Sequence, residues 1–224
     1  MRARQGEGTA DLFERSVQIP PSGVTGDLAV PINAQGAIVF AHGSGSSRLS
    51  SRNRFVARVL QQAGLATLLL DLLTAEEEQI DLRTRQLRFD TDLLARRLVE
   101  ATKWLASDVS VGGLPVGYFG ASTGAAAALI AAAELSGSTR AVVSRGGRPD
   151  LAGEALPKVR APTLLIVGGD DYAVIELNRK ALNELQCEKK LEIVPGATHL
   201  FEEPGALEQA AELARDWFQR YILT

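Results

Sequence analysis

The sequence predicts an α/β domain built on a mostly parallel central sheet of about seven or eight strands, with helices on both faces. Short apolar runs alternate with longer segments of helical spacing along the chain, and this alternation is typical of a parallel sheet. Several of the runs are continuously apolar, as strands buried on both faces are. A length of 224 residues fits one such domain. We therefore expect a single domain over residues 1–224, with residues 1–13 as a loose N-terminal extension.

The expected strands begin with a hairpin. Residues 14–20 and 24–31 flank the segment Pro-Pro-Ser-Gly at 20–23, which predicts an antiparallel pair at one edge of the sheet. The later strands are short apolar runs, and we expect them to pair in parallel. They are residues 37–41, 66–70, 114–119, 140–144, 162–167 and 191–194.

The segments between the later strands have helical spacing. The expected helices are residues 52–63, 84–107, 123–133, 174–186 and 205–221. The apolar stripe of the second helix is formed by Leu94, Leu98, Ala101 and Leu105. Residues 72–83 contain three successive glutamates and predict a polar loop. Since no insertion is long enough for a separate cap domain, we expect any lid to be this loop.

The pattern Gly120-x-Ser122-x-Gly124 lies where an expected strand runs into an expected helix. A turn this sharp needs flanking glycines to avoid steric clashes, and it holds the serine in a strained conformation. The N-terminal N–H groups of the following helix also favour a developing negative charge. A glycine-rich turn can be mere tight packing, but that alternative does not explain the serine. We therefore interpret Ser122 as a nucleophile.

Ser122, Asp171 and His199 each follow an expected strand. Because reacting groups lie beyond the carboxyl ends of parallel strands, we expect these three to form a triad. Histidine can take the serine proton near neutral pH, and a carboxylate orients the imidazole. The other histidine, His42, lies in a glycine-rich loop that we expect to contribute to an oxyanion hole. That hole should use the N–H of Thr123 and one from the Gly43-Ser44 turn.

The identity of the acid has alternatives. Asp170 is adjacent to Asp171, and either of them could cap a helix N-terminus instead. Asp71 also follows an expected strand, and we keep it as a fallback.

From about Val17 onward, the chain resembles the dienelactone-hydrolase-like group of the α/β-hydrolase superfamily. The motifs that carry the resemblance lie at residues 40–45, 117–124, 167–174 and 196–201. The resemblance implies an α/β-hydrolase fold, a Ser or Cys nucleophile in a triad, no cofactor, and hydrolysis of an ester, lactone or similar bond. The family pattern Gly-x-x-Asp-x-x-Val fits Gly168, Asp171 and Val174, which favours Asp171 over Asp170. True dienelactone hydrolases carry a cysteine nucleophile, so a serine here argues against dienelactone itself as the substrate.

Arginines are frequent near the expected mouth of the site. They are Arg48, Arg52, Arg145 and Arg148. We hypothesise that some of them, with Arg48, Arg145 and Arg148 as the main candidates, bind a carboxylate or phosphate of the substrate, because a guanidinium offers a fork of donors to such groups. The alternative is that they pair with glutamates 76–78 or Asp150, or face water. The sequence leaves both interpretations open.

Composition narrows the function further. A net charge of −3 gives no reason to expect nucleic acid or an anionic membrane as a partner. A single cysteine, Cys187, excludes an internal disulfide and fits a reducing compartment, and two histidines are too few for an ordinary zinc site. No apolar run is long enough to span a membrane, and no signal peptide is visible.

We therefore expect a cytoplasmic serine hydrolase (an esterase) that acts on a small molecule without a metal or cofactor, and the arginines raise the hypothesis that this molecule is anionic. The sequence leaves open whether the protein forms a homodimer. The alternatives are an acyltransferase with the same triad and a non-catalytic binding protein on the same fold.

Overall fold

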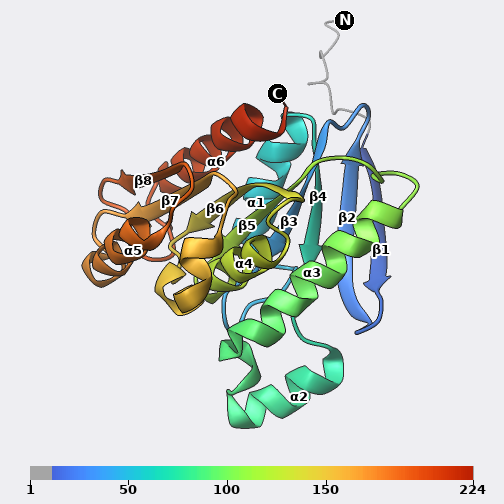
Figure 1. Cartoon of the computed structure of the whole chain (residues 1–224), viewed down its shortest axis with the longest axis horizontal. Coiled ribbons are helices and arrows are strands. Elements are labelled where there is room, and N and C mark those ends of the chain that lie inside the picture. Colours follow the sequence, from blue (N-terminus) through green and yellow to red (C-terminus); the bar gives the residue numbers. More distant parts are fainter. Residues whose placement is uncertain (1–11, 224) are drawn as a thin grey trace, which may run out of the picture.

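The computed structural model describes residues 12–223 and contains one sheet of eight strands in the order β1-β2-β4-β3-β5-β6-β7-β8 (Figure 1). The strands are β1 (Leu12–Ile19), β2 (Val24–Pro31), β3 (Gly36–Ala41), β4 (Leu65–Leu70), β5 (Val116–Ala121), β6 (Thr139–Arg145), β7 (Thr163–Gly168) and β8 (Lys189–Val194). This confirms the predicted fold class, an eight-stranded mixed sheet with an antiparallel N-terminal part.

The pairing of the strands decides where the site lies. β1 pairs with β2, and β2 with β4, in antiparallel fashion, whereas β4, β3, β5, β6, β7 and β8 pair in parallel. Ala41 at the end of β3 is in register with Leu70 of β4 and Gly120 of β5, and Ala121 is in register with Arg145 of β6. The loops that follow these four strands therefore start side by side along one edge of the sheet.

Helices cover both faces of the sheet (Figure 1). They are α1 (Ser51–Gln62), α2 (Ala75–Thr84), α3 (Thr91–Ser107), α4 (Thr123–Glu134), α5 (Tyr172–Glu184) and α6 (Ala206–Ile222), with 3-10 segments η1 (Leu87–Phe89) and η2 (Pro149–Lys158). On one face, α3 and α4 bury residues such as Val39 and Tyr118, and on the other face α1 and α6 bury residues such as Phe40 and Phe119. Alternate residues of one strand thus enter opposite cores, which explains the continuously apolar runs.

The prediction of a loop over residues 72–83 was wrong, because most of that segment is α2. Thr74 and Glu77 form a capping box, in which each side chain accepts a hydrogen bond from the backbone of the other residue. Three glutamates then occupy the first turn of the helix, where the helix dipole favours negative charge. The acidic run that indicated a loop is therefore a helix start.

The predicted helix over 84–107 is divided. Arg85 takes the left-handed conformation with φ 56° and ends α2, and the Asp90 side chain accepts the N–H of Leu93 at 2.9 Å, so α3 begins at Thr91. The four predicted stripe residues of α3 are buried as expected. The sequence did not predict η2, whose two pieces meet at Gly153, with φ 46°. Of the expected N-terminal extension, residues 12 and 13 belong to β1, and the rest lies outside the described residues.

Candidate active site

Ser122 lies between β5 and α4 in a strained conformation, with φ 50° and ψ −122°. The glycines on either side permit this turn. A Cβ placed on Gly120 would lie 2.5 Å from the Cα of Ala125, and one on Gly124 would lie 2.3 Å from the carbonyl oxygen of Ala41. The close approach of α4 to β3 and β5 therefore requires glycine at both positions.

The β6 end fixes the same turn from its other side. The N–H of Ser122 donates to the carbonyl oxygen of Arg145 at 3.3 Å, and the N–H of Arg148 donates to the carbonyl oxygen of Ser122 at 3.0 Å. These backbone bonds hold the serine in its strained conformation although no side chain caps α4.

His199 Nδ1 lies 2.7 Å from Asp171 Oδ2. Asp171 stands at the N-cap position of α5, yet its carboxylate makes no capping bond. The neighbouring Asp170 is exposed and is held by its backbone N–H, which donates to the carbonyl oxygen of Ala197 at 3.0 Å. Of the two aspartates that the sequence left in competition, the structure brings Asp171 to the histidine. A bond at Nδ1 leaves Nε2 of the ring to accept a proton.

Ser122 and His199 line one cavity of about 220 Å³ at the carboxyl edge of the sheet. Its wall includes Ser44, Ser46, Arg52 and Arg145. The structure thus gathers the predicted nucleophile, the predicted base and two of the four arginines expected near the mouth, Arg52 and Arg145, around a single cavity.

The glycine-rich segment after β3 forms one side of this cavity. A Cβ on Gly43 would lie 3.0 Å from the Cβ of Ser122, so the segment passes close to the candidate nucleophile. The N–H of Ser44, one of the amides that the sequence assigned to the oxyanion hole, donates to Thr123 Oγ1 at 2.9 Å. The Ser44 N–H is therefore already hydrogen-bonded in this structure, and it can donate to an oxyanion only after its bond to Thr123 Oγ1 breaks.

Arg145, the last residue of β6, is a buried cation with only 7% of its surface exposed. Its guanidinium lies 5.9 Å from the ring centres of both Phe119 and Phe201. Nη2 donates to Asn53 Oδ1 at 3.4 Å, whereas Nε and Nη1 are buried without a partner among the described residues. Burial, followed by the charge of nearby Arg52, lowers the pKa of Arg145 to about 10.

The other two arginines assigned to the substrate are paired within the chain. Arg148 donates from Nε and Nη2 to the carboxylate of Asp150 at 2.9 and 2.8 Å, which is the alternative that the sequence had left open. Arg48 is bound by Asp71 at 2.5 Å and lies 3.3 Å from Asp27.

Sequence reasoning missed the residues that surround Arg145. Asn53 is a buried polar residue on α1. Phe201 lies two residues after His199 and has only 2% of its surface exposed. An asparagine among the apolar positions of a helix was the one available signal for the first. The second ends the motif 196–201, but that motif does not indicate that Phe201 packs against Arg145.

We find no cluster of His, Cys, Asp or Glu able to hold a metal ion within residues 12–223. Across the same residues, no helix is both long and apolar enough to cross a membrane. Cys187 is a free, half-buried thiol whose pKa is raised by burial.

An eight-stranded mixed sheet, with a strained serine after the central strand β5 and a paired Asp and His at neighbouring strand ends, defines an α/β-hydrolase-like fold. Within this class, the chain belongs to the dienelactone hydrolase family, whose family model matches residues 24–222. The predicted resemblance is therefore confirmed.

The chain is similar to proteins from several organisms. A dienelactone hydrolase from Anabaena variabilis is 61% identical in sequence. Its crystal structure matches this one with a TM-score of 0.91, and the match covers 95% of this chain and 98% of that one. Est1E from Butyrivibrio proteoclasticus, with a TM-score of 0.74 at 15% identity over 93% of this chain and 99% of that one, shares the fold.

Two curated relatives, from two strains of Mycobacterium tuberculosis, are 60% identical over 209 residues and are provisionally named phosphoribosyl transferase. The match covers 92% of this chain but only 46% of the relatives, so the chain spans about half of their length.

Proposed function

We propose that the chain is a serine hydrolase that cleaves a small ester or lactone through Ser122, His199 and Asp171. The observation that carries this proposal is the 2.7 Å contact between His199 Nδ1 and Asp171 Oδ2, with the imidazole and the strained Ser122 lining the same cavity. Membership of the dienelactone hydrolase family supports the reaction class.

The proposed reaction proceeds through an acyl-enzyme. Ser122 Oγ attacks the substrate carbonyl carbon while His199 Nε2 takes its proton, and Asp171 stabilises the resulting imidazolium. The N–H of Thr123, at the start of α4, stabilises the oxyanion, joined by the N–H of Ser44 once it leaves Thr123 Oγ1. The imidazolium then protonates the leaving oxygen, and a water molecule deprotonated by His199 releases the acid.

The substrate that we propose carries a negative charge near the scissile bond. Arg145 and Arg52 line the cavity, and Arg145 keeps two buried donors without a partner. Arg52 is bonded to Glu202 at 2.9 Å, so Arg145 is the cation of the pair that lacks a carboxylate partner. A carboxylate or phosphate on the substrate would supply the missing acceptor.

The proposal is tested by labelling with a serine-reactive fluorophosphonate, followed by peptide mapping. We expect one adduct on Ser122, and its loss in the His199→Ala protein. Ser122→Ala should lower kcat for ester or lactone hydrolysis by about 10⁴-fold or more. Near-full activity in Ser122→Ala would refute the nucleophile, and absence of an adduct on the folded protein would favour a binding protein.

An acyltransferase would use the same groups, with an alcohol or amine in place of water. Product analysis with added alcohol or amine separates the two, because a transferase forms the new ester or amide in preference to the free acid. The phosphoribosyl transferase name belongs to relatives about twice as long, and we do not extend that activity to this chain.

A further inference from the structure

The segment 42–48, here called the oxyanion loop, connects β3 to the residues that precede α1. It contains two glycines and three serines between His42 and Arg48, and Gly45 has φ 72°. Such a sequence has little conformational preference of its own. The position of its amides beside Ser122 must therefore depend on contacts with neighbouring segments.

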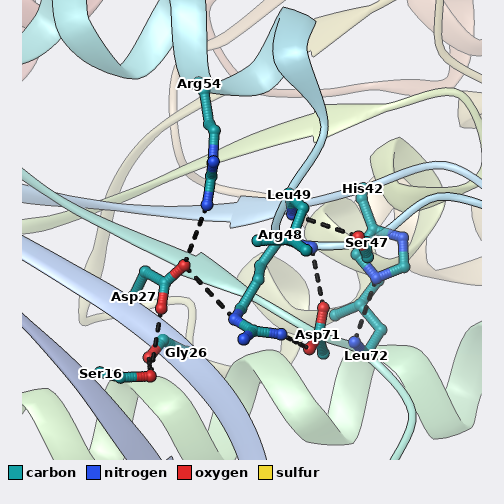
Figure 2. Close-up of polar contacts among 10 residues, drawn as sticks. All are labelled: Ser16, Gly26, Asp27, His42, Ser47, Arg48, Leu49, Arg54, Asp71 and Leu72. Carbon is teal, nitrogen blue, oxygen red and sulfur yellow. Dashed lines mark hydrogen bonds and ion pairs between the residues drawn. The ribbon is translucent and has the colours of Figure 1, made fainter.

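The start of the oxyanion loop is held by the His42 ring. Nδ1 lies 2.9 Å from the carbonyl oxygen of Gly43. Nε2 lies 3.2 Å from the backbone nitrogen of Leu72, a contact drawn in Figure 2. The Leu72 N–H must donate to Nε2, so Nδ1 carries the proton and donates to Gly43. The ring thus joins the loop to the segment that follows β4.

The end of the oxyanion loop is held by Asp71. Asp71 Oδ1 accepts the backbone N–H of Arg48 at 2.8 Å, and Oδ2 accepts Arg48 Nη1 at 2.5 Å (Figure 2). One carboxylate thus binds both the main chain and the side chain of the same residue. This explains why Asp71, kept as a fallback acid from the sequence, is engaged elsewhere than at the histidine.

Asp71 is itself well anchored. It directly follows β4, and its N–H donates to the carbonyl oxygen of Thr25 in β2 at 2.8 Å. Asp27 of β2 adds a second carboxylate 3.3 Å from Arg48 Nε. The anchor of the loop is therefore tied to the edge of the sheet at two strands.

We propose that Asp71 is a positioning residue for the hydrolytic reaction, acting through Arg48 to hold the oxyanion loop where its amides can meet the transition-state oxyanion. This inference rests on the proposed serine-hydrolase function. Neither residue lines the cavity beside Ser122, although Asp71 lines a smaller cavity of about 40 Å³ on the other side of the loop. We therefore assign both residues to positioning and not to contact with the reacting atoms. Loss of the anchor should then affect the chemical step more than substrate binding.

The test uses the full-length Asp71→Ala, Asp71→Asn, Arg48→Ala and Arg48→Lys variants, with kcat measured per fluorophosphonate-titrated site. Removing one oxyanion donor costs about 10²–10³ in kcat, so displacing the loop should cost roughly tenfold or more in Asp71→Ala, with KM within about twofold. Asp71→Asn still offers an oxygen to the Arg48 N–H and should lose less. Arg48→Lys should recover part of the loss seen in Arg48→Ala.

Combining Asp71→Ala with Arg48→Ala separates the two bonds. The Arg48 N–H remains in every Arg48 variant, so Asp71→Ala should lower kcat further even in the Arg48→Ala background. No further loss would mean that Asp71 acts through the guanidinium alone, and would contradict the part of the proposal that rests on the main chain.

Asp108 provides a matched control. Its carboxylate accepts the N–H of Ser110 at 3.0 Å and pairs with Arg15. Asp108 precedes β5, however, and therefore lies at the opposite edge of the sheet from Ser122. Asp108→Ala should lower thermal stability while leaving kcat per titrated site unchanged.

The outcomes separate this inference from the function on which it rests. If Ser122→Ala is inactive but Asp71→Ala keeps kcat within about twofold of the unsubstituted protein, the positioning role is wrong and the hydrolase survives. An equal fall in kcat for Asp71→Ala and Asp108→Ala would indicate a general loss of structure and would also overturn it. Activity that persists in Ser122→Ala removes the proposed function, and the inference with it.

Discussion

Arg145 is an unusual residue because it is a buried cation that uses few of its donors. Removing a charge from water costs several kcal/mol unless partners replace the lost hydration. Here the partners are two aromatic rings and one long hydrogen bond to Asn53. An arginine placed for structure alone would be expected to have a carboxylate partner, as Arg148 has in Asp150. The two buried donors without a partner, in a residue that lines the cavity, therefore support the proposal that Arg145 binds an anion.

Replacing Arg145 with Met should lower kcat/KM for an ester that carries a carboxylate by about tenfold or more, because a charge-assisted hydrogen bond contributes roughly 1.5–3 kcal/mol. Hydrolysis of a neutral ester of the same size should change little. The free energy of unfolding should stay constant or rise, since a poorly paired buried charge is removed. Steady-state kinetics on the two esters and urea unfolding measure these effects.

Arg148→Met is the matched control for this substitution, because Arg148 follows the same strand but is paired with Asp150. It should leave the ratio of the two esters unchanged. An anionic-to-neutral ratio that is the same in Arg145→Met as in the unsubstituted protein would eliminate Arg145 as the anion site.

The unit formed by β5, the elbow and α4 depends on space that side chains would fill. The Ala-rich sequence of α4 allows the helix to pack closely against the strands. A Cβ on Gly124 would lie 2.3 Å from the carbonyl oxygen of Ala41, so no side chain fits there. Local chemistry also sets α2, which begins at a capping box within a segment predicted from the sequence to be a polar loop. Glycines and caps thus set the position of elements here as much as apolar periodicity does.

Gly124→Ala should therefore destabilise the protein by roughly 2–3 kcal/mol or more, because the new methyl group meets main chain that cannot move aside. Urea unfolding gives the free energy, and fluorophosphonate labelling reports whether the elbow still activates Ser122.

Gly137→Ala is the control for this change, since a Cβ there would meet no atom within 4 Å. It should be neutral or slightly stabilising, because alanine reduces the conformational entropy of the unfolded chain. Equal effects of the two substitutions would contradict the steric explanation of the elbow.

At the scale of the whole molecule, His42 is one group that makes the free energy of unfolding depend on pH. Burial lowers the pKa of His42 below its ordinary 6.5, although its bond to Gly43 and the charges of Asp71 and Glu78 act in the opposite direction. Above pH 6.5 the ring is mostly neutral in the folded and the unfolded chain alike, so it adds no dependence on pH. Below that value the unfolded chain takes up the proton first, and the free energy of unfolding falls as the pH falls.

We therefore expect the free energy of unfolding to decrease from about pH 6.5 downward, and to decrease less steeply in His42→Asn. Urea unfolding of both proteins between about pH 5 and pH 8 measures the difference, and other titrating groups contribute to both curves. Parallel curves for the two proteins would mean that His42 is not the group responsible.

The succession of strands along the chain, the elbow at Ser122 and the family were predictable from the sequence, because they depend on local periodicity and on short motifs. The helix α2, the start of α3 and the segment η2 were not predicted. The candidate triad was also named there, and only its acid had competing residues. The side chain of Asp171 contacts His199, whereas Asp170 is held by its backbone N–H. The sequence does not show which of two adjacent side chains points toward the histidine. The resemblance to the family pattern was what favoured Asp171.

The sequence alone therefore determined the class of fold and named the candidate reacting groups. Only the tertiary structure decided which charges are free. Arg48 meets Asp27 and Asp71 because β2 and β4 are neighbours in the sheet. Arg145 lies near the ring of Phe119 from β5 and the ring of Phe201 from the segment between β8 and α6. The physical reason is that the partners of a charge are set by strand order and packing across distant segments, whereas strands and helices are set by residues close together in the chain.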